Sequence, residues 1–313
     1  SKLLSVTNGF GAQSKVSYAQ ANDASVYTPT ATLPNGTDAV QGKRSAVRRQ
    51  LVKSIQHSTG NGYWNQANYN YAGYAVDATG RGSLGFAQVT STNVQTGIKN
   101  TTWYWQAYPH TGGMRWAITQ SVGGVVLSES TSTPDQVTIK PSNTDLASTI
   151  LPYVKSSTVS KRDLGSQFMG TTTTTSGAPD AYGNVSSTTT TSTDNQTGNF
   201  VVSKTLSYEN KTWPLSNMIK AVETRTVPGN SIMRTVDYAY DSLDQLTSEI
   251  REQGNAALQT QTTYDRSQNS FGLVNKTSVT YFDPQKSLTR TIDVATVDYT
   301  ANGRFPSSVK NAV

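Results

Sequence analysis

Short β-favouring segments alternate with glycine-rich turns through most of this chain. Asn8-Gly9 and Gly123-Gly124 are strong turn signals between such segments, and adjacent antiparallel strands need only turns of this length. On this basis four hairpins are predicted in the first 130 residues: 3–7 with 14–19, 47–56 with 63–76, 89–94 with 99–108, and 115–122 with 125–130. The fold class indicated is all-β, an antiparallel hairpin meander that forms a twisted ribbon.

The second half continues this pattern less regularly. Strands are predicted over 168–175, 185–193, 200–208, 218–227, 232–240, 246–252, 258–264, 273–282 and 288–299. Between the halves, Pro134, Pro141 and Pro152 with a polar cluster predict an irregular connection. The chain is thus divided into a hairpin region over 1–130, an irregular connection over 131–165 and a second hairpin region over 166–313.

Two segments allow an alternative to strand. Val47, Leu51 and Ile55 recur every four residues and could form an amphipathic helix over 45–56, but they also alternate along one face of a strand. The threonine runs 171–175 and 188–191 could be a linker. Threonine is β-branched and the runs flank a turn symmetrically, so we favour paired strands there, as we favour a strand over 45–56.

The composition is polar without being strongly charged. Hydrophobic residues make up 35% of the chain and charged residues 15%, yet there are 16 Tyr, 7 Phe and 5 Trp. This aromatic content argues against disorder. The polarity lies in Ser, Thr, Asn and Gln, which suits sheets whose faces are exposed to water.

Charge and cysteine content exclude several classes of function. The net charge is +6, but the only dense basic run is Lys43-Arg44, Arg48-Arg49 and Lys53. We therefore interpret the charged side chains as exposed to solvent and expect no nucleic-acid partner.

The chain has no Cys, so thiolate metal sites, disulfides and a Cys nucleophile are excluded. No apolar window is long enough for a transmembrane helix, so no membrane span is expected. The start, Ser-Lys-Leu-Leu, has no initiator Met, and we interpret the chain as part of a longer polypeptide.

The most specific local feature is the glycine-rich segment 78–88. Gly80, Gly82 and Gly85 fall within six residues, between extended segments 69–77 and 89–98. Glycine adopts backbone angles that other residues avoid, so the segment predicts strand, reversal, strand.

The segment resembles a recurrent phrase of the Rhs/YD-repeat polypeptides, which include the toxin-complex B/C shell proteins. The matching residues are Asp77, Gly80, Arg81, Gly82, Leu84, Gly85 and Phe86. Further family-like phrases follow in order: residues 3–18, Tyr182-Gly183-Asn184 and Tyr240-Asp241. Tyr240 and Tyr264 are each followed by Asp, which is consistent with a YD spacing, although two copies do not establish a period.

The resemblance implies a β-ribbon that forms the wall of a hollow shell around a C-terminal toxin. The expected partners are the remainder of the same polypeptide and that toxin, and the expected location is secreted or on a bacterial cell surface. Two features of the family are missing. Asp283-Pro284 is followed by Gln-Lys-Ser-Leu rather than by the autoproteolytic motif, and no variable toxin domain is visible. The segment is therefore interpreted as wall.

Candidate catalytic residues are few. His57 and His110 are the only histidines, no nucleophile elbow is present, and both lie beside turns. Five acidic residues crowd one hairpin: Asp237, Asp241, Asp244, Glu249 and Glu252. Glycosidases need two carboxylates that face each other across a cleft. Acidic residues at strand ends normally serve to solvate turns, which is the interpretation that we favour. We expect no enzyme activity, no cofactor and no metal.

An aromatic segment over 101–108 is the main candidate for binding. As a strand it would place Trp103 and Trp105 on one face and Tyr104 and Tyr108 on the other. Such a surface could contact a glycan or a protein receptor, which would make the chain an adhesion module. The alternative, which we favour, is a strand buried between layers.

Overall fold

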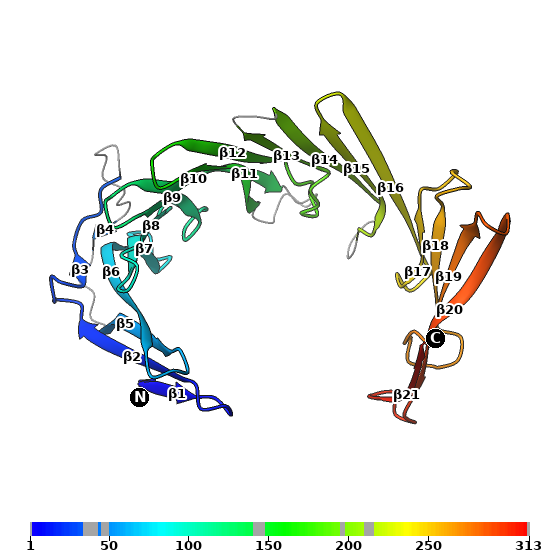
Figure 1. Cartoon of the computed structure of the whole chain (residues 1–313), viewed down its shortest axis with the longest axis horizontal. Coiled ribbons are helices and arrows are strands. Elements are labelled where there is room, and N and C mark those ends of the chain that lie inside the picture. Colours follow the sequence, from blue (N-terminus) through cyan, green and yellow to red (C-terminus); the bar gives the residue numbers. More distant parts are fainter. Residues whose placement is uncertain are drawn as a thin grey trace. The chain divides into compact units, whose positions relative to one another are not determined.

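The computed structural model describes residues 2–33, 43–44, 50–139, 148–194, 198–209 and 216–311, and these residues contain strands and no helix (Figure 1). The strands are β1 (Ser5–Thr7), β2 (Gln13–Gln20), β3 (Tyr27–Thr28), β4 (Lys43–Arg44), β5 (Gln50–Ser58), β6 (Trp64–Val76), β7 (Ser83–Asn93), β8 (Lys99–Tyr104), β9 (Met114–Gln120), β10 (Val126–Ile139), β11 (Thr149–Arg162), β12 (Phe168–Ser176), β13 (Ser187–Asp194), β14 (Asn199–Tyr208), β15 (Met218–Val227), β16 (Asn230–Tyr240), β17 (Leu246–Arg251), β18 (Thr260–Asp265), β19 (Lys276–Asp283), β20 (Leu288–Tyr299) and β21 (Pro306–Asn311).

The chain forms two compact units. The first contains Ser1–Ala178 and Thr191–Asn199, and the second contains Pro179–Thr190 and Phe200–Val313. In the first unit, β2 pairs with β1 and β5, and each strand from β5 to β11 then pairs antiparallel with its successor along the sheet, up to β12. In the second, each strand from β14 to β20 pairs antiparallel with the next. The predicted antiparallel hairpin meander is confirmed.

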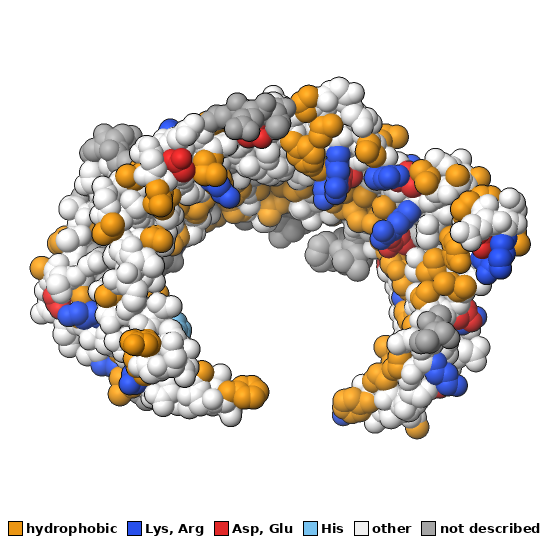
Figure 2. Space-filling view, in the orientation of Figure 1, with side chains coloured by type: hydrophobic (Ala, Val, Ile, Leu, Met, Phe, Trp, Pro, Cys, Tyr) orange, Lys and Arg blue, Asp and Glu red, His pale blue; other side chains and the backbone are white. Residues whose placement is uncertain are grey.

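A small apolar core lies in the first unit. The segment that precedes β4 folds onto the sheet, where Ala31 and Leu33 pack with Trp103. The indole nitrogen of Trp103 donates a 3.0 Å hydrogen bond to the carbonyl of Thr32, which anchors this segment. Val26 and Leu51 form a second cluster. Much of the surface in Figure 2 is polar and uncharged, as the composition predicts.

Hydroxyl side chains replace apolar contacts over part of the sheet. The threonine runs form β12 and β13, as predicted. Thr173 bonds Thr158 at 3.1 Å and Thr171 bonds Ser160 at 3.0 Å, both between β12 and β11. Such cross-strand hydroxyl pairs stabilise a sheet whose faces are in contact with water.

One five-residue turn recurs between strands. Its first residue is Asn8, Asp163, Asp180, Asp241 or Asn269, and the side-chain oxygen accepts hydrogen bonds from the backbone N–H groups two and four residues later. The fourth residue has a positive φ of 81°, 66°, 89°, 60° or 71° in Gly11, Ser166, Gly183, Asp244 and Gly272 respectively. The family-like residues Tyr182, Gly183, Asn184 and Asp241 are thus parts of turns.

A tyrosine hydroxyl fixes several strand ends in the second unit. Tyr208, Tyr240 and Tyr299 are the last residues of β14, β16 and β20. Each donates its hydroxyl proton to a backbone carbonyl 23, 22 or 25 residues earlier, in Val185, Met218 and Val274. Burial raises the pKa of Tyr208 and of Tyr240. Of the two tyrosines that are followed by Asp, Tyr240 is one of these three.

Two predictions of local structure have clear outcomes. The choice of strand over helix is confirmed for Gln50–Ser58, while residues 45–49 lie outside the described part. The irregular connection predicted over 131–165 is wrong for residues 131–139 and 149–162, which belong to β10 and β11, while residues 140–147 with Pro141 lie outside the described part. Pro134 is accommodated at a register shift, and Pro152 lies where β11 pairs with β10 alone, so neither removes a needed ladder bond. The three-region division itself stays a prediction.

Replacing Tyr240 by Phe should lower the free energy of unfolding by about 1 kcal/mol, because the 2.9 Å bond to the Met218 carbonyl is lost while the ring remains. Urea unfolding measures the change. Tyr182→Phe is the control, since its side chain is 51% exposed. An equal loss in both variants would contradict a specific role for the strand-end hydroxyl.

Acid should weaken the Asp180 turn. Burial by itself raises the pKa of Asp180. Hydrogen bonds from the Asn184 side chain and from backbone amides outweigh this effect and lower the pKa. A carboxyl with a lowered folded-state pKa stabilises the fold above its unfolded value of about 4, and this contribution is lost as the pH falls through the folded value. Wild type should therefore lose stability between pH 5 and about pH 3.

Asp180→Asn should retain the turn and lose this part of the pH dependence, because the Asn8 turn shows that an amide oxygen accepts the same two bonds. Asp180→Ala should cost about 1 kcal/mol at pH 6. Urea midpoints at both pH values test this, and an unchanged acid slope in Asp180→Asn would contradict it.

Candidate functional site

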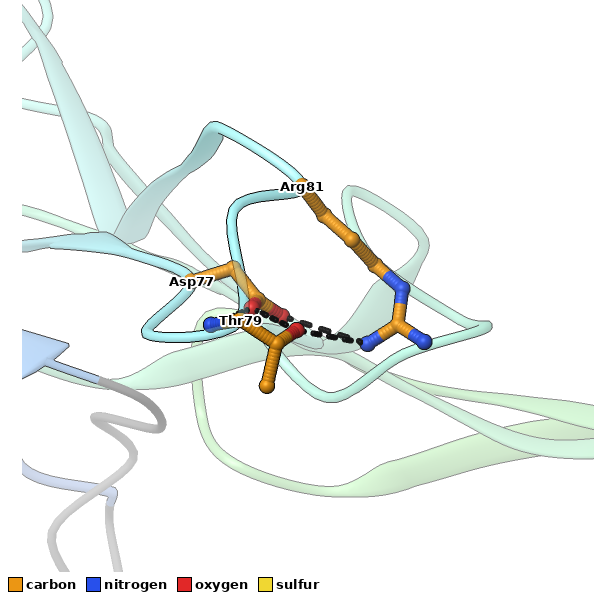
Figure 3. A network of polar contacts seen from close by, with 3 residues as sticks. All are labelled: Asp77, Thr79 and Arg81. Atoms are coloured by element: carbon orange, nitrogen blue, oxygen red, sulfur yellow. Dashed lines mark hydrogen bonds and ion pairs between the residues drawn. The ribbon is translucent and has the colours of Figure 1, made fainter.

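The glycine-rich turn joins β6 to β7 and is closed by a polar network (Figure 3). Asp77 accepts hydrogen bonds from the amide and hydroxyl of Thr79. Arg81 donates from Nη1 to Thr79 Oγ1 at 3.0 Å, and this nitrogen is 3.6 Å from Asp77 Oδ2. The Thr79 hydroxyl, its amide and Arg81 together lower the pKa of Asp77.

The turn is shorter than predicted. Gly80 and Gly82 have φ values of 89° and 94°, and the Asp77 amide donates to the Gly82 carbonyl at 2.9 Å. β7 then begins at Ser83, so the second part of segment 78–88 is strand rather than reversal. Leu84 is buried, and Phe86 packs against Tyr27, Tyr71 and Tyr74.

A buried glutamine connects the turn region to the aromatic segment. Gly73 in β6 and Gly85 in β7 both have positive φ, at 67° and 76°. The side-chain amide of Gln106, which is 1% exposed, donates to both of their carbonyls, at 2.8 and 2.9 Å. Residue chemistry alone gave no signal for this contact, since Gln106 lies in a run of aromatic residues.

The aromatic segment is only partly a strand. β8 ends at Tyr104, so the predicted strand over 101–108 is wrong beyond that residue. The chain instead forms a loop, closed by hydrogen bonds between the backbones of Trp105 and of Gly112 and Gly113. A register shift opposite Trp103 and Tyr104 leaves Arg115 unpaired in β9 and ends the regular alternation.

The four predicted binding residues therefore have different environments. Trp103 is 6% exposed and belongs to the core. The guanidinium of Arg115 lies 4.5 Å from the ring centre of Trp105, and that of Arg81 lies 4.1 Å from the ring centre of Tyr108. Tyr104 is half-buried at the end of β8. A glycan-binding role for these residues stays a prediction, but one face of Trp105 and one of Tyr108 are already occupied.

The candidate catalytic residues are engaged in ordinary structural contacts. His57 is exposed, and its Nδ1 lies 2.8 Å from the Ser14 hydroxyl on the neighbouring strand. In the acidic hairpin, Asp237 pairs with Lys220, Glu249 with Arg251 and Glu252 with Arg234. Within the described ranges, no three His, Cys, Asp or Glu residues are grouped as a metal site would require.

Among the described residues, no helix combines the length and the apolar character needed to cross a bilayer.

No protein-family model matches the chain, and no curated protein matches it. Solved structures do. A crystal structure of TcdB2-TccC3-Cdc42 superposes with a TM-score of 0.57 at 9% identity, covering 98% of this chain and 21% of that one. A TcdB2-TccC3 crystal structure gives 0.57 at 10%, covering 96% and 21%. The Photorhabdus luminescens Tc holotoxin pore gives 0.57 at 10%, covering 96% and 20%.

These matches define the class of fold. The chain spans about a fifth of the length of the toxin-complex chains that it matches. At this identity the comparison shows a shared fold along almost the whole chain. The fold that the Rhs/YD-repeat resemblance implies is therefore confirmed.

Replacing Gln106 by Met should lower the free energy of unfolding by about 2 kcal/mol, because two buried carbonyls lose their donor while the volume is nearly kept. Thermal and urea unfolding measure it. Gln120→Met, at a hydrogen-bonded but less buried site, is the matched control. A loss no larger than the control's would show that Gln106 does not hold the turn and loop together.

Proposed function

We propose that this chain is a structural segment of the wall of an Rhs/YD-repeat shell, which encloses and protects a toxin carried by the same polypeptide. The observation that supports this is the match of 96–98% of the chain to toxin-complex chains. In this proposal the partners are the rest of the polypeptide and its toxin. The complex is secreted or displayed on a bacterial cell surface.

The polarity of the strands supports a wall that has water on both sides. The first unit has small apolar clusters, and hydroxyl pairs connect β11 and β12. A sheet of this kind gains its stability from ladder bonds and cross-strand pairs rather than from a thick core. It can therefore extend sideways strand by strand, which is what a shell wall requires.

We also propose that the segment itself performs no chemistry. A wall needs no activated nucleophile, and three carboxylates of the acidic hairpin, those of Asp237, Glu249 and Glu252, are paired with Lys or Arg, while that of Asp241 accepts backbone hydrogen bonds in a turn. The adhesion alternative would need an open aromatic face. The guanidinium groups over Trp105 and Tyr108 make that alternative the less favoured one.

Limited proteolysis of the polypeptide that carries this segment tests enclosure. The C-terminal toxin should resist a broad-specificity protease until the shell is denatured. Val222→Pro should abolish this protection, because Val222 lies in β15 between Thr205 and Thr235 and proline removes a ladder donor.

Ala256→Pro is the matched control. Ala256 is the second residue of a turn in which the Leu258 amide donates to the Asn255 carbonyl, a position that accepts proline. The toxin should remain protected from the protease in this variant. Digestion of the toxin at the denatured rate in wild type, or saturable binding of the segment to a glycan array, would favour the adhesion alternative.

A further inference from the structure

A cleft of about 210 Å³ opens beside the aromatic loop, wholly within the first unit. Its walls are mostly apolar and come from the loop after β8, the first residue of β9, and strands β10 and β11. The principal lining residues are Trp105, Pro109, Met114, Pro134, Pro152 and Val154. The volume is large enough to hold one large aliphatic side chain, and the lining residue Val154 is 51% exposed.

Two irregularities of the sheet build this cleft. Trp103 pairs with Trp116 while Tyr104 pairs with Met114, so Arg115 is an extra residue in β9. Thr133 pairs with Ser156 while Pro134 pairs with Val154, so Lys155 is an extra residue in β11. Such bulges bend a strand and redirect its side chains, and they are enriched beside binding sites.

Several charged and polar groups around the cleft are already bonded. Asp135 accepts from Lys155 at 3.2 Å and from the Tyr153 hydroxyl at 3.3 Å. The Ser132 hydroxyl donates to the Met114 carbonyl. These contacts hold the lining residues in place and leave Tyr153 to present its ring to the cleft.

One donor is left without an acceptor. The indole nitrogen of Trp105 is buried and has no hydrogen-bond partner among the described residues. Its neighbouring atom Cδ1 lies 3.9 Å from where a side chain on Gly113, another lining residue, would begin. The edge of the ring that carries the N–H therefore lies next to Gly113 in the cleft lining, and an acceptor in the cleft reaches the covered nitrogen when this lining shifts. An unpaired buried donor costs free energy that an incoming acceptor would recover.

The chemistry favours a peptide over a sugar. Stacking of a sugar needs an open aromatic face, and Arg115 covers a face of Trp105. An extended peptide supplies what the cleft lacks, namely a carbonyl acceptor beside an apolar side chain. Grooves lined by aromatic residues and proline recognise extended peptides by this combination.

We propose that this cleft binds an extended polypeptide segment, which places one leucine-sized side chain among Pro109, Met114 and Val154 and gives a backbone carbonyl to the Trp105 indole N–H. This inference concerns a recognition site and is independent of enclosure. The chain then has a specific contact for polypeptide in addition to its structural role.

Indole N–H signals in nuclear magnetic resonance spectra of the ¹⁵N-labelled chain test the proposal. Trp105→Phe assigns the Trp105 signal. Titration with acetyl-Ala-Leu-Ala-amide should move this signal downfield and leave that of Trp116 unchanged. Trp116 is the internal control, because its indole nitrogen is also buried without a partner but does not line the cleft. The matched peptide with Ser in place of Leu should bind about tenfold more weakly, because it buries less apolar surface.

A second variant tests the place of binding. Val154→Phe fills the cleft mouth from an exposed strand position and should weaken the leucine peptide about tenfold. Val309→Phe, at an exposed valine in β21, should not. Circular dichroism confirms that both variants are folded. No shift at Trp105, equal binding of the two peptides, an equal shift at Trp116, or a shift caused by methyl glucoside instead would each overturn the proposal.

Discussion

The backbone hydrogen-bond ladder is the interaction on which this structure depends. The buried apolar clusters are small and lie in the first unit, around Trp103 and around Leu51. A ladder stays in register only if each reversal is fixed, and the Asx-type turns and strand-end tyrosines do this with side-chain hydrogen bonds to the backbone. Stability is thus distributed along the chain, hairpin by hairpin.

At the glycine-rich turn, the chain is held by a contact between residues that are far apart in the sequence, and not only by bonds within one hairpin. Positive φ at Gly73 and Gly85 turns two carbonyls away from the ordinary ladder, and the buried amide of Gln106 takes both. Arg81 then extends from the turn to Tyr108. The motif therefore fixes the position of its surroundings, including the aromatic loop beside it.

The sequence predicts the strands well because their signals are local. Glycine-rich turns and β-branched runs act over a few residues, so the threonine strands β12 and β13 follow directly. The errors arise where distant partners decide. Pro134 suggested a break, but a bulge in β10 and β11 absorbs it. The aromatic strand was extended past Tyr104 because alternation in sequence does not reveal that Arg115 is an extra residue in the partner strand. Sequence patterns miss the contact of Gln106 for the same reason, because its two acceptors are 33 and 21 residues away.

These long-range irregularities are also where the candidate functions lie. In the proposed role, a regular, polar meander is a wall that excludes larger molecules without recognising any of them. Recognition needs a concave surface and an unsatisfied polar group, and a flat ladder provides neither. The two bulges at Arg115 and Lys155 supply the concavity, and the loop closed on Trp105 supplies the donor. The departures from regular pairing, which sequence patterns do not reveal, therefore distinguish the regular part of the sheet from the part for which we propose polypeptide binding.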